Sequence, residues 1–151
     1  MANVLLMGNG AREHVIAEAL MRSKHDPKLF SYMKSNNPGI ASLSDKIVIG
    51  SYDDLEKINQ FAIENEIDFA IIGPEDPLAN GVVDSLNTIG IPSVGPTRDL
   101  ARLETSKTFT RNLLQKYNIP GNPRYRVFTS LEGIKEFVSE LDGIVIKPDG
   151  L

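Results

Sequence analysis

The stretch VLLMGNGAREH, residues 4–14, decides the fold of this 151-residue chain. Its first four residues are apolar, which is typical of a buried strand, and residues 8–10 form a turn with two glycines. From Ala11 to about Lys24 the pattern favours a helix. A buried strand, a glycine turn and a helix in this order predict the start of a parallel α/β sheet.

The same alternation continues to about residue 95. Short apolar runs predict further strands at residues 28–34, 46–50, 68–73 and 91–95. Two more helices are predicted, one capped by Asp53 and one over residues 78–89 that ends at Gly90. No helix is expected between the second and third strands. Because helices separate the other strands, we expect a doubly wound, Rossmann-like parallel sheet.

The chain changes character after residue 97. Helices are predicted over residues 98–104 and from Thr105 or Ser106 to about Tyr117, before a break at residues 118–123. A strand at 124–128, a helix capped by Thr129 and a strand at 144–147 are predicted to follow. We therefore divide the chain into an α/β domain (1–102), a linking helix (103–122) and the incomplete start of a second domain (123–151). About 29 residues are too few to bury a core, so we expect a fragment of a longer protein.

Composition excludes several classes of protein. A formal net charge of −4 excludes the basic footprint of a nucleic-acid binder. The absence of cysteine excludes a disulfide framework, a zinc–thiolate site and a cysteine nucleophile, and two histidines disfavour an imidazole-rich metal site. The longest apolar runs have four residues, which indicates neither a membrane span nor a secretion signal. We expect a cytoplasmic protein that handles small molecules.

The first glycine turn is typical of a phosphate site. The amide hydrogens of residues 10–12 are expected to be free at the helix start, where the helix dipole favours an anion, and Arg12 adds a positive charge. Dinucleotide binding is disfavoured, because Glu13 replaces the third small residue of that fingerprint and the second strand ends at Lys34 rather than at an acid. The alternative is a turn that uses glycine for its shape alone.

A second turn, GPEDPL at residues 73–78, follows another apolar strand. Ligands of parallel sheets bind beyond the carboxyl ends of strands where the strand order reverses. We therefore expect Glu75 near the phosphate, where it accepts hydrogen bonds from sugar hydroxyls. The alternative is that Glu75 and Asp76 only stabilise a helix N-terminus. Asp84 is expected to be structural or to support the site without contacting the ligand.

Two lysines beyond residue 100 are candidates for binding a polyphosphate. Lys107 lies in ETSKTF, residues 104–109, and Lys147 ends the last predicted strand. A lysine can hold a polyphosphate as a point charge, and the alternative for each is a solvated surface lysine. No Walker-type loop is present, so a nucleotide site would be of another kind.

Four motifs together resemble the phosphoribosylamine–glycine ligases, also called glycinamide ribonucleotide synthetases, of the ATP-grasp superfamily. They are GNGAREH at residues 8–14, GPEDPLANGVVD at 73–84, GPTRDLARLETSKTF at 95–109 and IVIKPDGL at 144–151. The motifs follow the order and spacing of the family and cover essentially the whole chain. Ala11 and Pro148 depart from the family pattern, and residues 36–40 match the corresponding loop only loosely, so no role is assigned to that loop.

The resemblance implies an ATP-dependent ligase of de novo purine biosynthesis. Such an enzyme joins 5-phosphoribosylamine and glycine through glycyl phosphate and gives glycinamide ribonucleotide, ADP and phosphate. The first turn would hold the 5-phosphate and Glu75 the ribose, while Lys107 and Lys147 would contact ATP. The substrate-binding residues implied are Asn9, Gly10, Ala11, Arg12, Glu13, Pro74 and Glu75.

The resemblance also implies what this chain lacks. Such a ligase uses ATP and magnesium, or manganese, and the glycine-rich ATP loop and the metal ligands would lie past Leu151. No catalytic side chain and no metal ligand is predicted within the chain, which would be inactive alone. The alternatives are another ATP-grasp enzyme or a non-catalytic module that binds a sugar phosphate or nucleotide.

Overall fold

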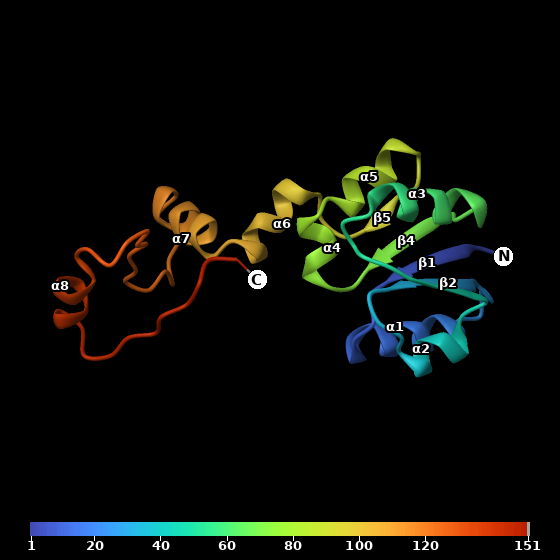
Figure 1. Ribbon diagram of the computed structural model, residues 1–151, viewed down its shortest axis with the longest axis horizontal. Helices are drawn as coiled ribbons and strands as arrows, with labels where there is room; N and C mark the ends of the chain where they lie inside the picture. Colours follow the sequence, from blue (N-terminus) through green and yellow to red (C-terminus); the bar gives the residue numbers. More distant parts are fainter. Residues whose placement is uncertain (151) are drawn as a thin grey trace. The chain divides into compact units, whose positions relative to one another are not determined.

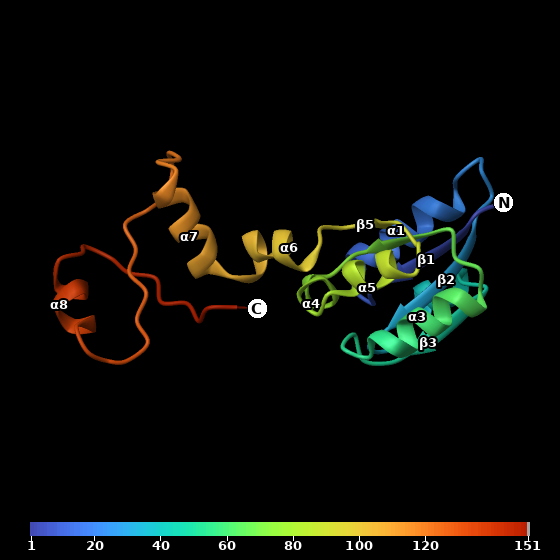
Figure 2. The same ribbon diagram turned by 90° about the horizontal axis from the view of Figure 1, so that it is seen from above.

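The structure is a computed structural model that describes residues 1–150, and it divides into two compact units, Met1–Ala101 and a second unit that begins at Arg102. The first unit is built on a five-stranded sheet in the order β3-β2-β1-β4-β5 (Figures 1 and 2). Every neighbouring pair of strands is parallel, so the predicted parallel sheet is confirmed. The strands are β1 (Asn3–Met7), β2 (Lys28–Met33), β3 (Lys46–Ile49), β4 (Phe69–Ile72) and β5 (Ser93–Val94).

Helices cover both faces of this sheet. Figures 1 and 2 show α1 (Ala11–Met21) and α3 (Leu55–Glu64) on opposite sides of the strands. Successive side chains of a strand point to opposite faces, so Leu5 of β1 packs in the cluster that includes α3, whereas Leu6 packs in the cluster that includes α1. The doubly wound arrangement is therefore confirmed.

The prediction of no helix between β2 and β3 was wrong. A short helix, α2 (Pro38–Leu43), lies there on the same side as α1. The Asn37 Oδ1 atom accepts hydrogen bonds from the amides of Gly39 (3.0 Å) and Ile40 (3.3 Å). Proline at the first helical position costs no hydrogen bond, so asparagine followed by proline is a helix-start signal.

The prediction of one helix over residues 78–89 was also wrong. Two helices, α4 (Glu75–Ala79) and α5 (Val82–Thr88), are separated at Gly81, whose φ of 83° is left-handed and ends a helix. Gly90, with a φ of 79°, follows α5 as predicted. The cap of α3 is Asp54, one residue after the predicted cap, because the Asp54 carboxylate accepts a hydrogen bond from the Lys57 amide (3.1 Å).

Beyond β5 the described chain is helical or irregular. The helices are α6 (Arg98–Thr105), α7 (Lys107–Lys116) and α8 (Ile134–Ser139). Ser106 caps α7, whereas α8 begins after Gly133 and not after the predicted cap Thr129. No helix within residues 1–150 has the length and apolar character that crossing a membrane requires.

The strands predicted at residues 124–128 and 144–147 were wrong. Neither segment is a strand in the structure, and between residues 102 and 150 no strand is found. A strand forms only when its backbone groups pair with a neighbouring strand, and neither segment pairs with one within the described residues. Local sequence pattern reports the tendency to extend but not the presence of a partner.

Candidate functional site

The two predicted glycine turns meet at one edge of the sheet. β1 and β4 are adjacent, with Met7 opposite Ile72, and the Gly73 amide donates to the Met7 carbonyl at 3.1 Å. The chain leaves β1 toward α1 on one face and leaves β4 toward α4 on the other, so the strand order reverses between them. Ligands of parallel α/β sheets bind at such a reversal.

Glu13 fills the space between the two turns. Its side chain is 3% exposed, and its carboxylate accepts hydrogen bonds from the Gly10 amide (2.7 Å) and the Arg12 Nε (3.2 Å). A Cβ atom at Gly8 or at Gly73 would lie 2.4 Å from the Glu13 Cγ, so both positions need glycine. The Gly10 amide is therefore not free, contrary to expectation, and Glu13 shapes the turn from inside.

Arg12 joins the two turns through an ion pair. Its Nη2 lies 3.2 Å from the Glu75 Oε1, and its side chain remains 59% exposed. The pKa of Glu75 is lowered, first by a hydrogen bond from its own backbone amide and then by Arg12, and the pKa of Arg12 is raised by its hydrogen bonds to Glu75 and Glu13. Both side chains are thus charged at neutral pH. A guanidinium has five N–H donors, so Arg12 can also serve an anion in front of the turn.

The start of α1 offers backbone donors beside Arg12. Residues 10–12 are exposed, and the first amides of a helix have no partner within the helix. Within the described residues no side chain accepts a hydrogen bond from the Ala11 or Arg12 amide. The Ala11 and Arg12 amides and the exposed Arg12 guanidinium are therefore available at this turn, which suits a phosphate.

Asn9 is held by the neighbouring strand ends. Its Oδ1 accepts hydrogen bonds from the Tyr52 hydroxyl (2.9 Å) and the Lys34 amide (3.3 Å), and its Nδ2 donates to the Ser35 hydroxyl (3.0 Å). Its carbonyl accepts a further hydrogen bond from the Asn37 Nδ2 (3.1 Å). The Asn9 side chain is used within the protein, where it fixes the position of the first turn.

Sequence reasoning missed the residues that hold Asn9. Tyr52 is buried, and burial raises the pKa of its hydroxyl, which stays protonated and donates to Asn9. Asn37 carried a local signal, the proline that follows it. Tyr52 lies 43 residues from Asn9, so no local signal could connect them.

Two further charged residues lie at the same edge. Lys34 follows β2, and its Nζ is 3.7 Å from the Asp76 Oδ2. From sequence alone, Lys34 argues only against a dinucleotide site. Pro74 precedes α4 and lies against the first turn, where its Cδ would be 2.8 Å from a Cβ atom at Gly8.

Asp84 has the structural role that the sequence predicts. Its Oδ2 accepts a hydrogen bond from the Arg98 amide at 2.8 Å, at the start of α6. Aspartate stabilises a helix start in this way, because it accepts from an amide that has no partner within the helix.

The two candidate ATP lysines lie in the second unit. Lys107 is the first residue of α7, and its Nζ donates to the Gly150 carbonyl. The Asp149 carboxylate accepts hydrogen bonds from the Thr108 amide (3.0 Å) and the Ser106 hydroxyl (3.2 Å), so residues 149–150 lie beside the start of α7. Lys147 is exposed, and within the described residues its side chain forms no hydrogen bond or ion pair.

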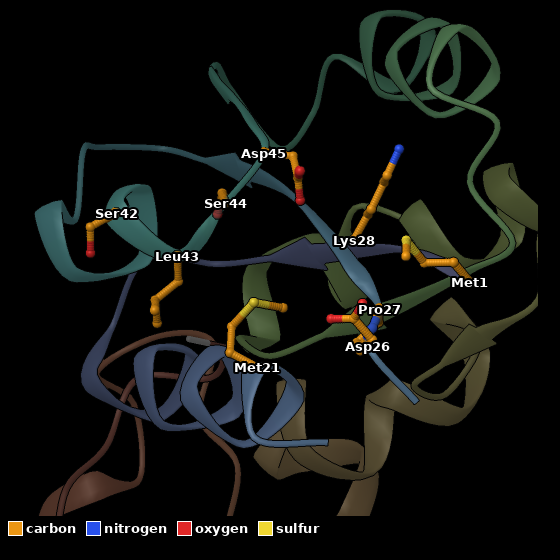
Figure 3. Close-up of a pocket in the computed structure, with 9 residues that line it drawn as sticks. All are labelled: Met1, Met21, Asp26, Pro27, Lys28, Ser42, Leu43, Ser44 and Asp45. Carbon is orange, nitrogen blue, oxygen red and sulfur yellow. The ribbon is translucent and has the colours of Figure 1, made fainter. Parts of the chain in front are cut away.

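The opposite edge of the sheet carries an open hollow (Figure 3). It lies at the amino ends of β1 and β2 and is lined by Met1, Met21, residues 26–28 and residues 42–45. Its Asp45 carboxylate already accepts a hydrogen bond from the Leu29 amide at 3.0 Å. None of the predicted site residues lines it. Within residues 1–150, no cluster of three or more acidic or histidine side chains is placed to hold a metal ion.

Comparison with known protein families gives a match that includes this site. The family described as "Phosphoribosylglycinamide synthetase, N domain" matches residues 2–104, which include both glycine turns. The chain belongs to this family. The resemblance that the four motifs indicate is thereby confirmed.

Curated relatives named phosphoribosylamine–glycine ligase are similar along nearly the whole chain. The relative from Methanocaldococcus jannaschii is 46% identical over 153 residues, and the one from Methanococcoides burtonii is 43% identical over 149 residues. These alignments cover 98% and 99% of this chain but 34% of each relative. The chain therefore spans about a third of the length of the curated relatives it matches.

Solved structures share the fold of this N-domain family member. An N5-carboxyaminoimidazole ribonucleotide synthetase in complex with ADP has a TM-score of 0.75 at 20% identity, over 93% of this chain and 35% of that chain. A phosphoribosylglycinamide synthetase from Anaerococcus prevotii has a TM-score of 0.66 at 15% identity, with the same coverage of 93% and 35%. At such identities the likeness shows a common fold.

Proposed function

We propose that the first unit binds the phosphoribosyl group of 5-phosphoribosylamine for an ATP-dependent ligase of purine biosynthesis. The ligase joins this amine to glycine through glycyl phosphate and gives glycinamide ribonucleotide, ADP and phosphate. One observation carries the proposal: the two glycine turns meet where the strand order reverses, with Arg12 and Glu75 3.2 Å apart across the edge. The family and the names of the relatives support the same reaction.

In this proposal the phosphate lies in front of the first turn. The Ala11 and Arg12 amides and the Arg12 guanidinium donate to its oxygens, and the α1 dipole favours its charge. Gly10 leaves the approach open, because it has no side chain and is exposed. Asn9 and Glu13 contribute by holding the shape of the turn from behind.

Glu75 and Pro74 form the sugar side of the site. When the Arg12 guanidinium turns to the phosphate, the Glu75 carboxylate can accept hydrogen bonds from ribose hydroxyls. The lowered pKa of Glu75 keeps this carboxylate ionised at neutral pH, so it acts as an acceptor only. Pro74 fixes the backbone before Glu75 and leaves no competing amide at that position.

The chemistry needs positioning rather than a nucleophilic side chain. ATP supplies the phosphoryl group that activates the glycine carboxylate, and the amine then attacks the acyl phosphate. Lys107 and Lys147 are proposed to contact ATP phosphates as point charges. Magnesium or manganese would neutralise charge on the ATP phosphates, and the described residues hold no cluster of ligands for a metal ion.

The domain boundaries are part of the same proposal. Residues 1–102 bind the sugar phosphate, residues 103–122 form a linking helix, and residues 123–151 begin the ATP-grasp domain of a longer enzyme. The partners are free small molecules in the cytoplasm, and neither nucleic acid nor a membrane takes part.

Hydrogen exchange on the intact protein tests the proposal. We expect glycinamide ribonucleotide to slow exchange of the amides in residues 8–14 and 73–76, because phosphate and ribose occupy both turns. The same compound without its phosphate should protect residues 8–14 much less. An equal effect of both compounds, or no protection by either, would contradict the phosphate assignment.

A pair of glycine variants sharpens this test. Gly10→Val adds a branched side chain whose Cβ atom would lie 2.8 Å from the Glu13 Oε2, so the turn must shift, and we expect the Kd of glycinamide ribonucleotide to rise at least tenfold. Gly143→Val makes the same chemical change at a position with no atom within 4 Å and should leave the Kd within twofold. Urea unfolding of both variants shows whether the loss of binding is separate from a loss of folding.

A further inference from the structure

A second ion pair crosses the edge beside the one already described. Lys34 lies 3.7 Å from Asp76, as Arg12 lies 3.2 Å from Glu75. In both pairs the cation follows β1 or β2, and the two carboxylates are consecutive residues at the start of α4. A ligand that enters between the two sides would meet both cations.

The Lys34 backbone is fixed to the first glycine turn while its charge is exposed. The Lys34 amide donates to the Asn9 Oδ1 (3.3 Å) and to the Tyr52 hydroxyl (3.2 Å), so its Cα cannot move independently of the turn. The side chain itself is 63% exposed, and that of Asp76 is 52% exposed. An exposed pair at 3.7 Å contributes little to stability, so stability does not account for a lysine here.

The charges at this edge favour a second cation beside a phosphate. Arg12 already faces two carboxylates, Glu13 and Glu75, and Asp76 adds a third negative charge. A phosphate monoester carries about −1.5 to −2 charges at pH 7. Arg12 alone sets one cation against three carboxylates, and Lys34 adds a second positive charge that lowers the repulsion of an arriving phosphate.

We infer that Lys34 is a second cationic ligand of the phosphate group, and that Asp76 is its partner only until the phosphate binds. The inference rests on the proposed function and adds a residue to that site. It gives the two members of the pair opposite roles. Lys34 contributes to phosphate binding, whereas Asp76 competes with the phosphate for Lys34.

Two variants that should change the Kd in opposite directions test this inference. The probe is ribose 5-phosphate, titrated into the intact protein by calorimetry at one fixed salt concentration, because phosphate contacts depend on salt. We expect Lys34→Met to raise the Kd about tenfold and Asp76→Asn to lower it two- to fivefold. In the double variant the effect of Asp76→Asn should disappear, because Lys34 is no longer there to be released.

Controls separate charge from position. Lys24→Met removes an exposed lysine beyond the far end of α1 and should leave the Kd within twofold. Lys34→Arg keeps the cation and should recover most of the binding that Lys34→Met loses. Urea unfolding should give nearly the same midpoint for every variant.

Two outcomes would overturn the inference and leave the proposed function standing. One is binding that Gly10→Val abolishes but Lys34→Met leaves unchanged. The other is an Asp76→Asn variant that binds as weakly as Lys34→Met, which would make the pair structural. If the wild-type protein binds neither ribose 5-phosphate nor glycinamide ribonucleotide, the proposed function fails and this inference fails with it.

Discussion

Similar apolar sequence forms a buried strand in the first unit but remains exposed in the second unit. In the first unit, the apolar residues of β1 lie between paired strands, and Leu5, Leu6 and Met7 are completely buried. In the second unit, the apolar run at residues 144–146 is exposed, with Val145 at 80% and Ile146 at 81%. Pairing with neighbours, and not apolar character alone, decides which run becomes a strand.

What does form in the second unit is local. α7 is capped by Ser106, whose hydroxyl accepts a hydrogen bond from the Phe109 amide at 3.1 Å, and the Arg102 guanidinium stacks over the Phe109 ring at 4.0 Å. Tyr125 donates to Asn112 on the same helix. Helices satisfy their own backbone, so they appear where sheet partners do not.

The largest expected difference between the units concerns apolar side chains. Leu5→Ala leaves a cavity in the centre of the sheet and should lower the free energy of unfolding of the first unit by about 2–5 kcal/mol. Ile146→Ala removes an exposed side chain and should change the free energy of unfolding of the second unit by less than about 0.5 kcal/mol. Urea unfolding measures both changes. Equal losses in the two variants would contradict the division between a packed first unit and an exposed run in the second.

Glycines give a second comparison, of intermediate size. Gly73→Ala would place a Cβ atom 2.4 Å from the buried Glu13 side chain and should cost about 1–3 kcal/mol of stability, with weaker phosphate binding as the turn shifts. Gly143→Ala meets no atom within 4 Å and should be neutral or slightly stabilising. Thermal unfolding and the Kd of ribose 5-phosphate are the measurements. A Gly73→Ala variant as stable as wild type would show that the Glu13 side chain can move to accommodate a Cβ atom at residue 73.

Much of the first unit was predictable because its signals are local. Each glycine turn directly follows an apolar run, and the reversal of strand order that brings the turns together follows from the alternation of strands and helices. The pairing of Arg12 with Glu75 depends on two turns 63 residues apart, and only the sheet topology made their proximity predictable.

The rest depended on contacts that no local pattern encodes. The roles of Tyr52 and Lys34 arise because the loops after β2 and β3 meet Asn9 in space. Gly81 divides a run that has helical periodicity, because its left-handed φ matters more than the apolar spacing. In the second unit, the strand patterns at 124–128 and 144–147 lack partners within the described residues, so the same reasoning that succeeded for β1 failed there.

Helix caps give a third, smaller comparison between the units. Asn37→Ala removes the cap of α2 and also the hydrogen bond from its Nδ2 to the Asn9 carbonyl. Ser106→Ala removes the cap of α7 and also the hydrogen bond from its hydroxyl to the Asp149 carboxylate. We expect each to cost about 1 kcal/mol of helix or protein stability. Asn37→Asp keeps the cap but cannot donate to Asn9, so it should retain stability and still weaken ribose 5-phosphate binding. Hydrogen exchange of the amides at the starts of α2 and α7 measures the effect of losing each cap. Equal ligand binding in Asn37→Ala and wild type would show that Asn37 does not position the first turn.

The smallest expected effect concerns two carboxylates with lowered pKa values, Glu75 in the first unit and Asp149 in the second. Hydrogen bonds from backbone amides are the main cause in each case, from its own residue for Glu75 and from Thr108 for Asp149. A lowered pKa means that the folded protein favours the ionised form, so this contribution to stability is complete above the ordinary carboxyl pKa and disappears as the pH falls through the lowered one.

We therefore expect the wild-type first unit to lose more stability between about pH 6 and pH 3 than a Glu75→Gln variant does, by less than about 1 kcal/mol because the pair is partly exposed. Urea unfolding across this pH range measures the difference. Glu56→Gln, which removes an exposed carboxylate from α3, is the matched control and should follow the wild-type curve. Asp149→Asn should instead change the pH dependence of exchange at the Thr108 amide, because that amide donates to the Asp149 carboxylate. A Glu75→Gln curve parallel to wild type would mean that Arg12 and the amide of residue 75 do not favour the ionised carboxylate in solution. The Arg12–Glu75 pair would then no longer support the placement of a charged sugar phosphate at this edge.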